Sequence, residues 1–241
     1  MRLLVRSWCD GGRSSQKNHL IVENVLGKKT RARAQDVYQE IFYPRFIKGD
    51  PPKAWKIARI LEDRELPFEI IKPVYYWITA RSDRLLYDFV IDEILPKSKS
   101  TDLTIRVDET NNWITKRLSA QKQSWSKSVT IRVAQGFLAA LRDFEILEGA
   151  TKKSVAPVYL PVESFAYLCF CLHESGNTGE RLIKHSDWKL FLMEPPVVER
   201  LFLEAHQNRL LHYEAAGKLY RIEFFARNME EMADVIAGRR D

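Results

Sequence analysis

The sequence predicts a mainly α-helical, compact protein with elements that resemble a winged helix-turn-helix and with short β-hairpins. Three observations predict this class. Apolar residues recur at the three- and four-residue spacing of amphipathic helices. Serine, aspartate and proline precede many of these stretches, as they do at helix starts. Two pairs of short, alternating apolar runs flank loops that contain glycine, which is typical of hairpins.

We expect a basic helical domain over residues 1–96. Its first helix would begin at Ser14 or Ser15 and end at Gly27, a residue suited to the end of a helix. The next helix has a continuous apolar stripe and is expected to stop at Pro44, which cannot donate a backbone hydrogen bond. The stripe consists of Ala34, Val37, Tyr38, Ile41 and Phe42.

Three further helices complete this domain. Asp50, followed by two prolines, is predicted to cap the first of them. Pro67 opens the second, and Pro73 is expected to kink or divide it. Ser82 is predicted to cap the third, which Pro96 ends. On the helix that Asp50 is predicted to cap, the expected buried side carries Trp55, Ala58 and Leu61.

The polar segment of residues 96–102 predicts a boundary, with a second domain over residues 103–241. A short strand over residues 103–107 comes first. Asp108 is then predicted to cap one helix and Ser126 to cap a longer one.

A hairpin around Gly149 follows the longer helix. The order of helix, turn, longer helix and hairpin is that of a winged helix-turn-helix. Near the C-terminus, residues 211–213 and 219–224 alternate on either side of a glycine-containing turn and predict a second hairpin. A helix over residues 229–236 ends the pattern.

The composition excludes several classes of protein. With 45% hydrophobic and 29% charged residues among 241, the chain is globular and not disordered. No stretch approaches the roughly 20 apolar residues of a membrane span, and we see no secretory signal. Cys9, Cys169 and Cys171 are too few for a disulfide framework. We therefore expect a cytoplasmic protein with no membrane partner.

Positive charge is concentrated in the first quarter of the chain. Residues 1–60 carry 13 Lys/Arg and 5 Asp/Glu, a net charge of +8, against +6 for the whole chain. Cations at a helix N-terminus oppose the macrodipole, whereas a bound phosphate would offset that cost. We predict phosphate contacts there, the alternative being a solvated surface. The N-terminal basic cluster consists of Lys28, Lys29, Arg31 and Arg33.

A second group of candidate nucleic-acid contacts surrounds the helix that begins at Ser126. The first turns of a recognition helix present polar side chains to the major groove, and the hairpin would form the wing. The alternative is that these side chains only cover the outside of a core helix. The candidates are Gln123, Lys127, Ser128, Thr130, Arg132, Lys152 and Lys153.

No pattern of residues predicts an enzyme, a cofactor or a small-molecule substrate. Cys169, Cys171 and His173 have a spacing that could suit metal ligands, but no second pair completes a zinc site and the neighbours are apolar. We interpret them as core residues and expect no metal. His185 and Asp187 are close in sequence, but the carboxylate occupies a helix-capping position, so we predict no catalytic residues.

Aromatic residues offer another route to nucleic acid, because they can stack on unpaired bases. Most of them stand at helical spacing among aliphatic residues, which favours core packing. These residues are Trp55, Tyr75, Tyr76, Trp77, Trp113 and Trp188.

Several segments between residues 30 and 236 together resemble the BrxA family, the small accessory proteins of bacterial BREX phage-defence systems. The segments are "TRARAQDVYQEIFYPRF", "VYYWITARSDRLLYDFVIDEIL", "RVAQGFLAALRDFEILEG" with "PVYLP", and "LFLEAHQNRLLHYEAAGKLYRIEFF". The resemblance implies a helical fold likened to the RNA-binding factor NusB. It also implies DNA binding without catalysis, beside methyltransferase, ATPase and phosphatase-like subunits. The first 25 or so residues depart from this pattern.

Charge, element order and resemblance together predict a non-enzymatic, duplex-DNA-binding accessory protein of BREX defence. Three alternatives stay open: an RNA-binding module, a protein-interaction subunit of the defence complex, and a metal enzyme whose site the sequence does not reveal.

Overall fold

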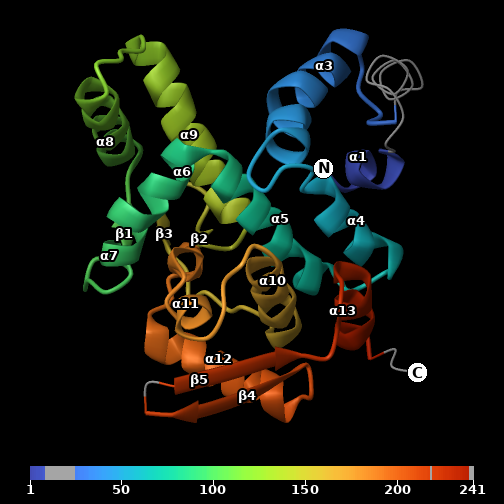
Figure 1. Ribbon diagram of the computed structural model, residues 1–241. Coiled ribbons are helices and arrows are strands. Elements are labelled where there is room, and N and C mark those ends of the chain that lie inside the picture. The colour runs from blue at the N-terminus through green and yellow to red at the C-terminus, as the bar shows by residue number, and fades with distance from the viewer. Residues whose placement is uncertain (9–24, 218, 239–241) are drawn as a thin grey trace. The chain divides into compact units, whose positions relative to one another are not determined.

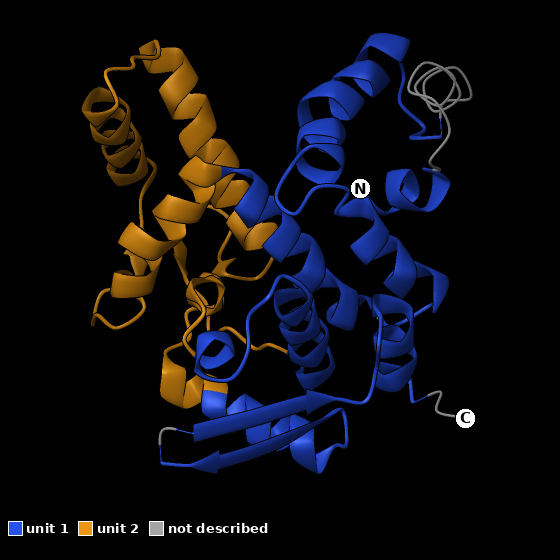
Figure 2. Ribbon diagram, in the orientation of Figure 1, with its two compact units in different colours: residues 1–83, 161–183, 199–241 blue, residues 84–160, 184–198 orange. Residues whose placement is uncertain are grey.

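The computed structural model describes residues 1–8, 25–217 and 219–238 (Figure 1). The fold is mainly helical with two small antiparallel sheets, as the sequence predicts. The chain forms two compact units, each assembled from separated segments (Figure 2). The helix predicted to end at Gly27 lies almost wholly outside the described residues, but Gly27 itself has the left-handed φ of +59°.

Unit 1 consists of residues 1–83, 161–183 and 199–241. Its described elements up to Asp83 are helices. They are α1 (Arg2–Ser7), α3 (Arg31–Asp36), η1 (Val37–Ile47), α4 (Trp55–Asp63) and α5 (Phe68–Ser82). Later segments add α10 (Val162–Glu174), α11 (Glu180–Ile183), most of α12 (Pro195–Gln207), β4 (Leu211–Ala216), β5 (Leu219–Phe224) and α13 (Met229–Ile236).

Unit 2 consists of residues 84–160 and 184–198. Residues 96–102, where the sequence places a domain boundary, lie inside this unit. Its elements are α6 (Arg84–Phe89), η2 (Val90–Ile94), α7 (Leu95–Lys97), β1 (Thr104–Ile105), α8 (Val107–Ala120), α9 (Lys127–Asp143), β2 (Leu147–Glu148), β3 (Lys153–Val155) and η3 (Ser186–Phe191).

The apolar stripe of the second predicted helix is confirmed at three of its five positions, since Val37 is half-buried and Ile41 is 37% exposed. The predicted end of that helix at Pro44 is wrong. Ala34, Tyr38 and Phe42 are buried, and the helix passes through Pro44 as the π-helix η1. The hydrogen-bond spacing at the end of η1 is the wider one of a π-helix, because Lys48 N–H donates to the carbonyl of Tyr43 at 3.1 Å, five residues back. Pro44 itself donates no backbone hydrogen bond.

Three other helix boundaries differ from the expected ones, two of them because the expected capping side chains form hydrogen bonds elsewhere. α4 begins at Trp55, since the Asp50 carboxylate accepts a hydrogen bond from Arg81 at 2.6 Å and caps no helix. The Ser82 hydroxyl donates to the carbonyls of Arg45 and Ile78 instead of capping α6. The helix after α5 also continues past Pro96, to Lys97.

α5 is a single helix of 15 residues that contains Pro73. The expected division at Pro73 is therefore absent from this described segment, although Pro67 does open the helix as predicted. The predicted burial of Trp55, Ala58 and Leu61 on α4 is confirmed.

In unit 2, α8 and α9 pack against each other, and α9 also contacts β2. β2 belongs to a three-stranded sheet with the order β1-β3-β2. Thr104 pairs with Ser154, and Leu147 pairs with Val155, both antiparallel. Ser126 caps α9 as predicted, because its hydroxyl accepts a hydrogen bond from Val129 N–H at 3.4 Å. α8 starts after Arg106, one residue before Asp108, and has no side-chain cap.

The second hairpin and the final helix are confirmed. β4 and β5 pair from Leu211 with Phe224 to Ala216 with Leu219. The turn contains Gly217 with a φ of +62°, a conformation that favours glycine. α13 spans the predicted residues and is capped by Asn228.

Aromatic rings run through the core of unit 1. Trp8 contacts Phe42 with ring centroids 5.4 Å apart, Phe42 stacks on Phe46 at 5.5 Å, and Phe46 contacts Tyr75 at 5.6 Å. These contacts join the residue that follows α1 to η1 and α5. Within the described part of the chain, no helix is both long and apolar enough to cross a membrane.

Candidate nucleic-acid interface

The N-terminal basic cluster lies at the start of α3 in unit 1, and all four of its cations are exposed. Lys29, Arg31 and Arg33 form no ion pair with any residue that the structure describes. The Thr30 hydroxyl accepts a hydrogen bond from Arg33 N–H at 3.2 Å and so caps the helix. This hydrogen bond makes the Arg33 amide unavailable to a phosphate. Phosphate binding at this point would therefore depend mainly on the cationic side chains.

Positive charge near this cluster also affects the N-terminal ammonium group. Burial lowers the pKa of the Met1 ammonium, and the charge of Lys28 lowers it further. By contrast, two other cations near the N-terminus serve the fold: Arg2 and Arg6 both pair with the buried carboxylate of Glu62. The cations behind the net charge of +8 in the first 60 residues thus have two roles. Arg2 and Arg6 pair with a carboxylate inside the fold, whereas the N-terminal basic cluster is exposed.

The second group of candidates lies in unit 2, at the start of α9. Lys127, Ser128 and Arg132 are exposed. Lys127 and Arg132 form no ion pair with the residues that the structure describes. Gln123 is exposed in the loop before the helix.

Thr130 belongs to the core, contrary to its selection as a contact residue. Its side chain is 4% exposed, and its hydroxyl donates to the carbonyl of Lys127 at 3.0 Å. It lies on the same face of α9 as Ala134, Phe137 and Leu141, which are also buried. We leave it out of the proposed interface.

The hairpin β2–β3 carries the two candidate wing lysines. Lys152 is exposed, whereas Lys153 is half-buried and donates from Nζ to the carbonyl of Ala150 at 3.0 Å. Gly149 has a φ of +88°, and a Cβ there would lie 2.0 Å from the Lys152 carbonyl oxygen. Glycine is therefore required to form this turn, at the end of which both lysines lie.

A stronger signal around α9 is a long absence of acids, which the sequence analysis missed. Residues 110–142 contain six Lys/Arg and no Asp/Glu, although the chain has 32 acids in 241 residues. Arg117 pairs with Asp88, and Arg142 pairs with Asp143. The others form no ion pair with described residues: Lys116, Lys122, Lys127 and Arg132. We call residues 110–142 the acid-free segment.

Gln135 is a further residue that the sequence analysis missed. Ser128, Arg132 and Gln135 are all exposed and stand at spacing i, i+4 and i+7, which places them on one face of α9. Arginine and glutamine are the side chains that read guanine and adenine edges in the major groove. Helical spacing from Arg132 was the signal that could have identified Gln135.

Two of the three candidate metal ligands, Cys169 and Cys171, are part of the core of unit 1, and His173 is half-buried. Cys169 and Cys171 are buried free thiols on α10, and burial raises the pKa of both. The Cys171 thiol contacts the Met229 sulfur at 3.8 Å. Among the described residues, no group of three or more His, Cys, Asp or Glu could hold a metal ion.

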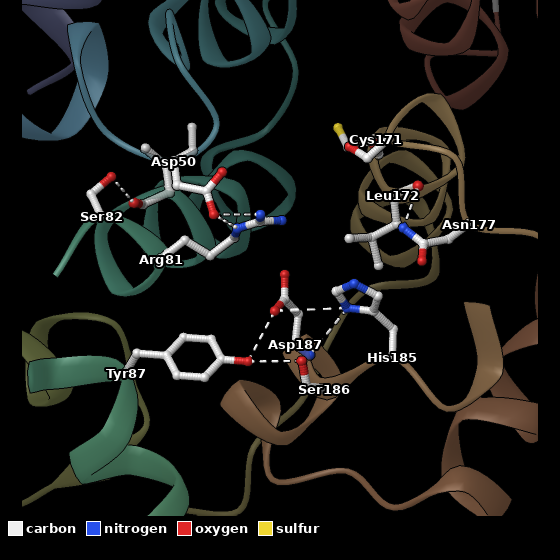
Figure 3. A network of polar contacts seen from close by, with 12 residues as sticks. Asp50, Arg81, Ser82, Tyr87, Cys171, Leu172, Asn177, His185, Ser186 and Asp187 are labelled. Atoms are coloured by element: carbon white, nitrogen blue, oxygen red, sulfur yellow. Dashed lines mark hydrogen bonds and ion pairs between the residues drawn. The ribbon is translucent and has the colours of Figure 1, made fainter. Parts of the chain in front are cut away.

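His185 and Asp187 form a structural contact in unit 2 (Figure 3). Asp187 is buried, and its carboxylate accepts a hydrogen bond from the Tyr87 hydroxyl at 3.1 Å. His185 Nδ1 accepts a hydrogen bond from Asp187 N–H at 3.2 Å and caps η3. The histidine therefore holds the cap, in place of the carboxylate that the sequence suggested.

The aromatic residues considered for base stacking are mostly in the core. Trp55, Tyr75, Tyr76, Trp77 and Trp188 are buried. Trp113 is half-buried and contacts Phe89 with ring centroids 5.2 Å apart. Their interpretation as packing residues is confirmed.

The two groups of cations thus belong to different units, the N-terminal basic cluster to unit 1 and the residues around α9 to unit 2. Both lie within the region that a family model recognises. The model described as BrxA matches residues 1–170 of the chain. No curated protein matches the chain, and no solved structure does.

Proposed function

We propose that this chain, which belongs to the BrxA family of BREX-associated defence proteins, is a non-enzymatic accessory protein that binds duplex DNA in the cytoplasm. The observation that carries the proposal is the acid-free segment on α8 and α9, whose cations include four without an ion pair among the described residues. Concentrated cations bind a polyanion by releasing its counterions.

The elements of unit 2 suggest how the duplex would be held. β1, α8, α9, β2 and β3 follow one another in the order of a winged helix-turn-helix. In that arrangement α9 is the recognition helix and presents Ser128, Arg132 and Gln135 to the major groove. Lys152 on the hairpin would contact phosphate as the wing.

The N-terminal basic cluster would add phosphate contacts from unit 1. Lys29, Arg31 and Arg33 are exposed and unpaired with described carboxylates, so their charge is available to a ligand. Phosphate contacts carry no sequence information, so they would raise affinity for all DNA sequences alike.

Two alternatives follow from the same features. An RNA-binding module would use the same cations, in keeping with the likeness of this family to NusB. A protein-interaction subunit would direct its basic surface at an acidic partner among the other BREX subunits. Both are distinguished from duplex-DNA binding by direct competition.

The deciding experiment is fluorescence anisotropy of a labelled 30-base-pair duplex at several salt concentrations. We expect the affinity to fall steeply with salt, because each phosphate contact releases about 0.9 counterion. Unlabelled duplex should displace the probe at lower concentration than single-stranded RNA of the same length. No binding at low salt would contradict the proposal, and stronger competition by RNA would favour the RNA-binding alternative.

A further inference from the structure

An exposed tryptophan, Trp125, lies in the loop between α8 and α9. It is 42% exposed and stands immediately before Ser126, the cap of α9. All the residues of this loop, 121–126, are exposed. Tryptophan is highly buried on average, so an indole this open to water needs an explanation.

The ordinary explanation accounts for only part of this exposure. A residue just before a helix cap can pack against the first turn as a hydrophobic staple, which would place Trp125 against Thr130. Thr130 is already buried to 4% exposure, whereas Val129, the residue before it, is itself 38% exposed. An apolar surface therefore remains open on Trp125 and Val129.

The charges around this apolar surface indicate what could cover it. Trp125 lies inside the acid-free segment, with Lys122 and Lys127 on either side in sequence. Neither lysine forms an ion pair with described residues. A ligand that meets an indole among cations must offer flat apolar faces together with negative charge. Nucleic acid does so through its bases and phosphates.

We propose that Trp125 stacks on a nucleobase, and that the loop between α8 and α9 binds DNA at unpaired or unstacked bases. The inference rests on the proposed DNA binding of unit 2 and names the form of DNA that this site prefers. In an intact duplex the faces of the bases are covered by their neighbours. Trp125 can reach them only where the stack is open, and opening an intact stack costs free energy.

The experiment compares three 30-base-pair probes by fluorescence anisotropy: a fully paired duplex, the same duplex with a five-nucleotide unpaired bubble, and the bubble with 2-aminopurine at its centre. We expect the wild type to bind the bubble more tightly than the paired duplex. Trp125→Ala should lose roughly 5- to 150-fold in affinity for the bubble, with a smaller change for the duplex. Stacking should quench 2-aminopurine with the wild type and not with Trp125→Ala.

Two further variants serve as controls. Trp125→Phe keeps an aromatic ring and should retain most of the preference for the bubble. Tyr159→Ala removes another exposed aromatic of unit 2, one that is 79% exposed and outside the acid-free segment. It should leave both affinities unchanged.

The outcomes separate this inference from the proposed function. If the wild type binds no DNA, the proposed function fails and this inference fails with it. If the wild type binds duplex with steep salt dependence but Trp125→Ala binds the bubble equally well, the stacking inference alone is overturned. A loss of affinity equal for bubble and duplex, without quenching, would likewise overturn stacking.

Discussion

Arg2 donates two hydrogen bonds to Glu62, from Nε to Oε1 at 2.7 Å and from Nη2 to Oε2 at 2.8 Å. Arg6 donates a third to the same carboxylate, and the Tyr75 hydroxyl a fourth. Burial raises the pKa of Glu62, but these hydrogen bonds outweigh it and hold the pKa below its ordinary value of 4.5. One buried carboxylate thus links α1, α4 and α5.

The first prediction concerns this carboxylate. Glu62→Gln should lower the free energy of unfolding by about 2–4 kcal/mol, because it leaves two guanidinium groups without their counter-charge. Urea denaturation at pH 7 measures this loss. The ionised carboxylate stabilises the fold above pH 4.5, and the contribution disappears as the pH falls through the lowered folded-state pKa.

A pH series distinguishes the electrostatic cause from a packing defect. The difference in stability between wild type and Glu62→Gln should begin to shrink below pH 4.5, where the carboxylate of the unfolded chain takes up a proton. It should disappear once the pH is below the lowered pKa of the folded state. A difference that stays constant down to acid pH would show that charge is not the reason.

The second prediction concerns the N-terminal basic cluster. Lys29→Ala, Arg31→Ala and Arg33→Ala combined should weaken duplex binding and reduce the slope of log affinity against log salt by up to about 0.9 for each lost contact. Thermal stability should be unchanged or slightly higher, because cations are removed from a helix N-terminus. Anisotropy and thermal melts give the two readouts.

A matched control removes three exposed arginines elsewhere in unit 1, by combining Arg181→Ala, Arg200→Ala and Arg227→Ala. This variant has the same net charge as the cluster variant. If both variants lose affinity equally, the effect comes from total charge, and the cluster is not a binding site.

The third prediction separates exposed from buried positions on α9. Arg132→Ala should reduce affinity for duplex DNA with little change in stability, because its side chain is exposed and unpaired among the described residues. Thr130→Val should do the opposite and cost about 1 kcal/mol of stability through the lost hydroxyl hydrogen bond. The same loss of affinity from both substitutions would argue against α9 as the contact helix.

The fourth prediction concerns the thiols of α10. Burial raises the pKa of Cys169 and Cys171, so at pH 8 neither should react with a disulfide reagent such as DTNB in the native state. In a Cys9→Ser background, two thiols should react only after denaturation. Rapid reaction of the native protein would show that α10 opens readily.

Features that depend on neighbouring residues could be predicted from the sequence. Ser126 caps α9 and Asn228 starts α13 because the capped amides lie within three residues. The turn at Gly217 likewise depends on the conformation of one residue. The burial of Thr130 was also open to prediction, since it has the helical spacing of Phe137 and Leu141.

Features that depend on distant residues could not be predicted. Asp50 has the position of a helix cap, but Arg81 competes for its carboxylate from 31 residues away. Residues 96–102 have the composition of a linker, yet Lys99 pairs with Glu194, 95 residues further along the chain, inside unit 2. The local amino-acid composition does not reveal the partner in either case, because both contacts form only when the chain folds.

The division of each unit into separated segments has a consequence for synthesis on the ribosome. α10 packs on α5, and α13 packs on α4 and α10, so unit 1 cannot complete its core until Ile236 has left the exit tunnel. Unit 2 needs nothing beyond Val198. Unit 2 can therefore assemble while the apolar faces of α4 and α5 that will contact α10 and α13 are still uncovered. Over most of translation, these apolar faces of the nascent chain are accessible to chaperones.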